Sequence, residues 1–142
     1  MSTDTLNFNK YISNNREALS KEITDRFFEQ YPHIKEKYSE NDIYKTIQDF
    51  SYHLSYLAES VTLNNKKMFL DYMSWVKNLF MNLNFNIQNL SLSLECLRDV
   101  LLEKIDDEEI KKLVGTYINE SIELLSKDKE KADKNYIKNN HG

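Results

Sequence analysis

Glycine and proline are almost absent from this chain of 142 residues, and their absence constrains the fold more than any other feature. Gly115, Gly142 and Pro32 are the only three. Folds built from strands and tight turns need many more turn-forming residues, so the sequence predicts an all-α domain. Asparagine pairs such as Asn64-Asn65 stand between apolar stretches, where they take over capping and turn roles.

Apolar residues repeat at steps of three and four, which is the pattern of helices that bury one face. The stretch 66–83 is apolar around most of its girth, which predicts a central helix packed on more than one side. Residues 1–126 are expected to form one domain, and 127–142 a charged tail that is a frayed helix end or disordered. The expected helices span residues 15–30, 41–63 (capped by Asn41), 66–83, 87–105 and 108–125, with a short leading helix at 6–12.

Charge and composition exclude several partners. The formal net charge is −4 and the sequence has no basic stripe, which argues against a nucleic-acid or anionic-membrane surface. No run of about 18 apolar residues is long enough to span a membrane. The N-terminus lacks the apolar stretch of a signal peptide. The single Cys96 cannot form an internal disulfide, so a reducing, cytoplasmic location is expected.

Catalytic and metal-binding patterns are not found. Neither His33 nor His53 has a glutamate three residues before it, which di-iron helical bundles require. Cys96 follows Glu95 in a leucine-rich stretch, and both features favour a buried, unreactive thiol. A phosphate-binding loop needs more glycines. We therefore expect a protein without enzymatic activity.

One polar stripe stands out beside an apolar one. Asp49, His53, Tyr56 and Ser60 follow at steps of four, three and four, so they share one helix face. His53 would then lie at the rim of an apolar cavity, with Asp49 holding its ring through a hydrogen bond. The alternative is a surface histidine paired with Asp49 outside any pocket. The aromatic residues of 66–83 are open to the same two interpretations, a tunnel wall or ordinary core.

A family resemblance is carried by the motifs Tyr52-His53-Leu54, Tyr56–Ser60, Asp71-Tyr72 and Trp75. In these the chain resembles the haem-free, globin-like sensor domains of sporulation sensor histidine kinases. Their stand-alone relatives are the plasmid-encoded sporulation-inhibitory proteins of the anthrax bacillus. A similar H-x-x-[YF]-L-A…Y-x-x-W pattern occurs in helical modules that precede cobalamin-binding domains.

The resemblance implies a globin-like helical sandwich of five to six helices without haem, homodimerised through its last two helices. It implies a fatty acid in a hydrophobic tunnel, a chloride ion in a neighbouring polar chamber, and inhibition of sporulation by sequestering the kinase's activating signal. The predicted polar donors are His53 with Tyr56 or Tyr72, and Arg98. The predicted tunnel walls are Phe50, Leu54, Leu57, Phe69, Met73, Val76, Leu94 and Leu97.

Two other functions remain open. The chain is alternatively a purely protein-binding helical regulatory module with a solid core, which would bind a partner without any lipid. A haem or tetrapyrrole sensor using His53 is a third possibility. It is disfavoured because the stretch 66–83 has no proximal histidine to ligate iron.

Overall fold

The computed structural model describes the backbone of residues 3–141 and the side chains of residues 4–127. Over this backbone every regular element is a helix, which confirms the all-α prediction. The elements are α1 (Thr3–Gln30), α2 (Pro32–Lys35), α3 (Glu40–Thr62), α4 (Lys66–Asn82), α5 (Ile87–Lys104) and α6 (Glu108–His141).

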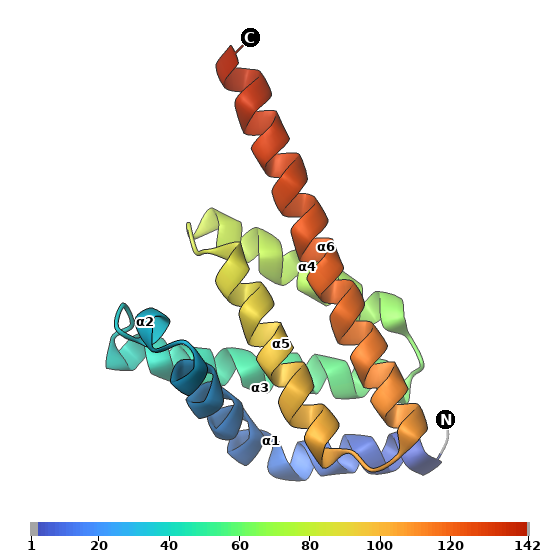
Figure 1. Ribbon diagram of the computed structural model, residues 1–142. Helices are drawn as coiled ribbons and strands as arrows, with labels where there is room; N and C mark the ends of the chain where they lie inside the picture. Colours follow the sequence, from blue (N-terminus) through green and yellow to red (C-terminus); the bar gives the residue numbers. More distant parts are fainter. Residues whose placement is uncertain (1–2, 142) are drawn as a thin grey trace.

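The helices form two crossing layers (Figure 1). α5 and α6 lie side by side and cross α3 and α4, while α1 packs along α3 at the base. The start of α1 lies beside the start of α6. Among the helices that the structure describes, none combines the length and hydropathy of a membrane span.

The N-terminal third differs from the prediction. One continuous helix, α1, replaces the two helices expected at 6–12 and 15–30. The Asn14-Asn15 pair does not end a helix there, and the side-chain amide of Asn15 donates to the Tyr11 carbonyl one turn earlier in the same helix (2.8 Å). Ile12 and Leu19 are both buried, so α1 keeps one face on the core across this point. No helix was predicted between residues 30 and 41, but the short α2 lies there, and Pro32 starts it as a first-turn residue.

Polar caps define the other helix ends. Ser39, not the predicted Asn41, caps α3: Asp42 N–H donates to Ser39 Oγ (3.1 Å) and Ser39 N–H donates to the Asp42 carboxylate (3.0 Å). Asn65 caps α4 by accepting from Met68 N–H (3.1 Å). Asn64 has a φ of 51°, a left-handed conformation that asparagine tolerates at a helix end. The asparagines at 64–65 and 84–86 therefore do serve as caps and turns, whereas Asn14-Asn15 lies inside α1.

The last two predictions about helices have different outcomes. α4 contacts α3, α5 and α6, but it is not buried all round, because Trp75 is 62% exposed and Leu79 is 39% exposed. The prediction of a central helix packed on more than one side is therefore confirmed, although the outer side of α4 carries exposed apolar residues. α6 continues as helical backbone through His141, so residues 127–141 extend that helix. The division into a domain and a tail stays a prediction.

Candidate functional site

His53 lies in the core and not on the surface or at a rim, since only 3% of it is exposed. Its Nδ1 lies 2.7 Å from the hydroxyl of Tyr72 on α4, so its partner is Tyr72 and not the predicted Asp49. The ring also packs edge-on against Phe50, with centroids 6.1 Å apart. Burial lowers the pKa of His53 to about 4, which keeps the imidazole neutral at pH 7.

Tyr72 is bonded to His53 and is affected by the charge of Asp49. Burial, and next the negative charge of Asp49, raise the pKa of Tyr72, so its hydroxyl keeps its proton while it shares a hydrogen bond with His53 Nδ1. Burial also raises the pKa of Asp49 to about 6, against the opposing effect of Lys45. His53 and Tyr72 thus form a buried polar cluster between α3 and α4, and Asp49 lies close enough to influence the pKa of Tyr72.

An exposed aromatic surface lies outside this cluster. The rings of Tyr56 and Tyr72 stack, with centroids 3.9 Å apart and an angle of 10° between their planes. The Trp75 ring lies next to Tyr72, with centroids 6.4 Å apart and an angle of 28° between the planes. Tyr52, one turn before Tyr56 on α3, is 62% exposed, and Tyr56 is 43% exposed. Of these rings only Tyr72 is buried.

The predicted tunnel walls are all fully or almost fully buried and belong to one continuous core cluster. Neither of the two surface pockets described below is lined by any of them. Arg98 does not join His53 and Tyr72; it binds Asp99 (3.0 Å) on its own helix and Asn119 (2.9 Å) on α6. The structure thus brings the predicted apolar residues together, with His53 and Tyr72 beside them, but leaves Arg98 apart.

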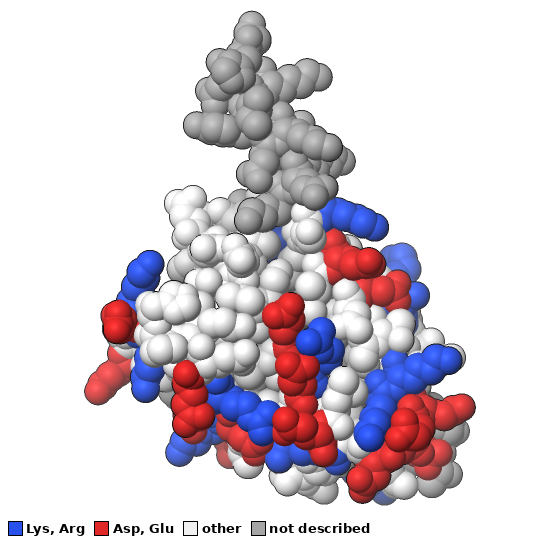
Figure 2. Space-filling model, in the orientation of Figure 1, with Lys and Arg blue, Asp and Glu red and all other residues white. Residues whose placement is uncertain are grey.

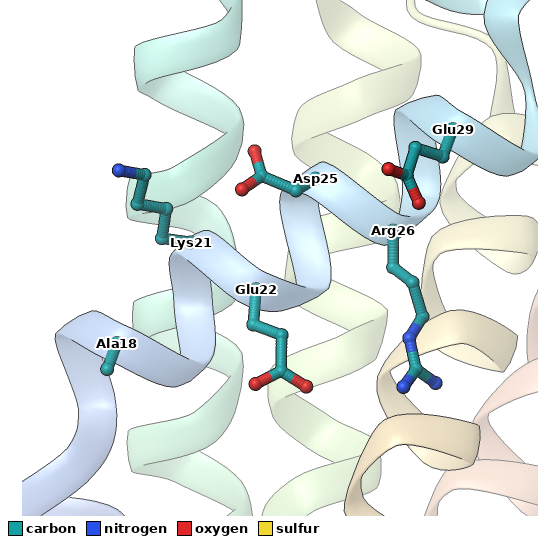
Figure 3. A pocket seen from close by; sticks show the side chains of 6 residues that line it. All are labelled: Ala18, Lys21, Glu22, Asp25, Arg26 and Glu29. Carbon is teal, nitrogen blue, oxygen red and sulfur yellow. The ribbon is translucent and has the colours of Figure 1, made fainter.

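The first pocket is a shallow, charged strip on the outside of α1 (Figure 3). Its lining comes from this one helix, and two of its charged side chains bind α5. Arg26 makes two hydrogen bonds to Glu103 of α5 (2.7 and 2.9 Å), and Glu22 pairs with Lys104 (3.1 Å). These contacts fasten α1 to α5, so we assign the strip a structural role.

The second pocket is a cleft of about 820 Å³ where the starts of α1, α4 and α6 meet the end of α3. Its floor includes the buried side chains of Val61, Ile110 and Tyr117. Its polar residues include Lys66 and Lys112. Lys66 forms an ion pair with Glu120 (2.9 Å), whereas Lys112 makes no ion pair within residues 4–127. The remaining lining residues are Asp4, Thr5, Thr62, Leu63, Asn64, Glu109, Leu113 and Thr116.

Sequence reasoning missed this cleft for a physical reason. Its residues come from four helices and the turn after α3, and six of the thirteen belong to α6. Those six follow helical spacing, but the pattern of α6 alone does not show a cleft, because the cleft exists only once the ends of α1, α3 and α4 are brought beside α6. The one usable signal was the lysine pair Lys66-Lys67 directly after a predicted turn.

Cys96 is the buried structural thiol that the sequence predicted. It is 4% exposed, and its Sγ–H points to the carbonyl of Ile23 on α1 at 3.7 Å. Burial raises the pKa of the thiol to about 11. Since the thiolate is the reactive form, Cys96 is a poor nucleophile in the folded protein.

Comparison with known proteins corrects the function predicted above. A family model for phycobilisome proteins matches residues 2–125. No curated protein matches the chain. The resemblance to sporulation sensor domains is therefore wrong, and with it the predicted fatty acid, chloride and kinase-signal roles. The alternative of a regulatory protein-binding module is not supported either.

The misleading motifs have a structural explanation. His53, Leu54, Leu57 and Ser60 are all buried between α3 and its neighbours. Their spacing reflects helix packing, so it does not identify a ligand. The expected globin-like, all-helical architecture agrees with the phycobilisome family, whose members have that fold and no enzymatic role. With a match over residues 2–125, this chain belongs to the phycobilisome protein family.

Proposed function

We propose that this chain is a non-enzymatic, light-harvesting-type protein that holds a linear tetrapyrrole of the bilin class by non-covalent contacts. The cleft between α1, α3, α4 and α6 is the proposed site, and its two lysines above an apolar floor are the observation that carries the proposal. The support from the family is that its members carry bilins. The cytoplasmic location predicted from the sequence is part of the same proposal.

Covalent attachment does not fit this chain. Family members bind their bilin covalently, which requires an accessible thiol, and Cys96 is the only cysteine. Its side chain is buried against α1, and its pKa is raised to about 11. Cys96 is also absent from the lining of both surface pockets. A bilin held by this protein must therefore be held without a bond to sulfur.

The cleft suits the chemistry of a bilin. Its volume of about 820 Å³ falls in the usual range of ligand sites, about 300–1,000 Å³. Val61, Ile110 and Tyr117 offer an apolar floor to the pyrrole rings. A bilin also carries two propionates, which match the ammonium groups of Lys66 and Lys112. Lys66 would exchange its exposed pair with Glu120 for a propionate at little cost, because such pairs are weak.

The test is a titration of the protein with biliverdin, followed by visible absorption. Thr116 is exposed on α6 and lines the cleft, so Thr116→Trp fills the site without disturbing the core. Glu123→Trp is the matched control, because Glu123 is exposed on the same helix and outside the cleft. We expect saturable binding by the natural chain and the control, and none by Thr116→Trp. Equal binding by both variants, or no binding at all, would contradict the proposal.

The lysines give a graded second test. An exposed ion pair contributes about 0.2–1 kcal/mol, so each of Lys66→Ala and Lys112→Ala should weaken binding by at most about fivefold. Raising the salt concentration should weaken bilin binding by the natural chain toward the affinity of the two lysine variants. Lys127→Ala, an exposed lysine of α6 outside the cleft, serves as the control. If the control weakens binding as much, the attraction is not specific to the cleft.

A further inference from the structure

α4 has a second apolar stripe, of which residues 4–127 bury Tyr72 and leave Trp75, Leu79 and Leu83 exposed. Met68, Tyr72, Trp75, Leu79 and Leu83 follow at steps of four, three, four and four, so they line one side of the helix. Trp75 and Leu83 are 62% and 53% exposed, and Leu79 is 39% exposed. On a single surface residue such exposure is ordinary, but on a continuous stripe it marks an interaction surface.

α3 widens this surface. Tyr56 stacks on Tyr72, and Tyr52 lies one turn before it, so the stripe joins the aromatic surface described above. At the far end of α4 the charge-poor surface continues, because residues 78–94 contain no charged side chain. Figure 2 shows this uncharged area where α4 turns into α5.

We infer that a second copy of this chain covers this surface, with the two α4 helices antiparallel and Trp75 near the two-fold axis. We call the surface formed by Tyr52, Tyr56, Trp75, Leu79 and Leu83 the α3–α4 face. It is separate from the cleft, so the inference does not depend on the proposed function.

The stripe is arranged for pairing with itself. Trp75 lies near its middle, with Met68 seven residues before it and Leu83 eight residues after it. At 1.5 Å per residue these ends are roughly 10 and 12 Å from Trp75 along the axis. In an antiparallel pair the Met68 end of one copy therefore meets the Leu83 end of the other. Such a pairing is isologous and closed, as in most dimers, and it opposes the two helix dipoles favourably.

The apolar area of the face is about half of what one partner buries in a standard dimer interface. A Tyr or Trp side chain carries about 150–250 Å², so the five partly exposed side chains of the α3–α4 face offer about 400–500 Å² together. A standard interface buries about 800 Å² per partner. The face supplies about half of this from apolar groups, and the polar residues along both helices supply a rim of the usual kind, including the Lys67–Asp71 pair (2.7 Å).

The experiment is molecular mass by light scattering after size exclusion, measured over a range of protein concentrations. We expect about twice 16.9 kDa for the natural chain and 16.9 kDa for Trp75→Glu and for Leu79→Lys. Tyr44→Glu is the control, since Tyr44 is also an exposed tyrosine of α3 (59%) but makes none of the ring contacts of the face. Circular dichroism verifies that each variant is folded.

Trp75 also reports the contact directly, because it is the only tryptophan of the chain. Its emission should shift to shorter wavelength as concentration rises and the ring becomes buried. A natural chain that stays at 16.9 kDa at all concentrations would overturn the inference. So would a dimer that Trp75→Glu leaves intact and Leu102→Glu on α5 disrupts, since that result would place the contact on the last two helices, as predicted from the sequence.

Discussion

Lowering the pH from 7 to 5 should destabilise this protein through His53. The pKa of His53 is about 4 in the folded chain and 6.5 when exposed, so the unfolded chain takes up the proton first as pH falls. The contribution of neutral His53 to the free energy of unfolding is therefore fully present above about pH 6.5 and is lost as the pH falls toward 4. One pKa unit corresponds to about 1.4 kcal/mol, so His53 alone should cost about 2 kcal/mol between pH 7 and 5.

Asp49 opposes this loss. Its pKa rises from 3.8 to about 6 on folding, so the folded chain holds its proton more tightly, and stability from this group increases as pH falls through 6. Because Asp49 is partly exposed, solvent screens its charge, and we take the stability that it adds between pH 7 and pH 5 as only about 1 kcal/mol. The natural chain should then lose about 1 kcal/mol from the two groups together.

Urea unfolding at pH 7 and pH 5 separates the two contributions. Asp49→Asn should lose about 2 kcal/mol between the two pH values, because only the His53 effect remains. His53→Asn keeps an acceptor near Nδ1 and cannot titrate, so it should gain about 1 kcal/mol instead of losing it. The change with pH of each variant is subtracted from that of the natural chain, so the contributions of the other titrating groups cancel. If His53→Asn shows the same pH dependence as the natural chain, the assignment of the effect to the buried imidazole is refuted.

Three further predictions concern the fold. Ser39→Ala removes the capping box of α3 and should lower the free energy of unfolding by about 0.5–2 kcal/mol; an unchanged urea midpoint would show that the cap is dispensable. Leu54→Trp adds bulk to a side chain that is 0% exposed and should cost about 1–3 kcal/mol or more, whereas unchanged stability would reveal a cavity. Cys96 should resist a thiol-colouring reagent at pH 8 until urea unfolds the chain; rapid reaction of the folded protein would contradict its burial.

Local signals explain what could be predicted about the fold. Apolar residues at helical spacing and nearby asparagines predict the approximate bounds of α3, α4 and α5. Each of these signals involves residues that lie close together in the sequence. The continuity of α1 was missed for the same reason. Asn14-Asn15 looks like a cap locally, and only the burial of Ile12 and Leu19 against other helices shows that the helix runs through.

Contacts between helices explain what could not be predicted about the site. Helical spacing suggested Asp49 as the partner of His53, but the partner is Tyr72, which is 19 residues away on α4. Periodicity also cannot distinguish an apolar residue buried in its own chain from one left on the surface. Trp75 and Leu79 were therefore expected inside, and they lie outside.

The most direct test of the account is the state of the pigment after unfolding. The protein is saturated with biliverdin, its visible spectrum is recorded, and the sample is then passed over a gel-filtration column in denaturant. We expect the pigment to travel with the folded chain and to separate completely from the unfolded one, because Cys96 cannot reach it. Pigment that stays attached to the unfolded chain, or that never travels with the folded one, would contradict non-covalent binding in the cleft.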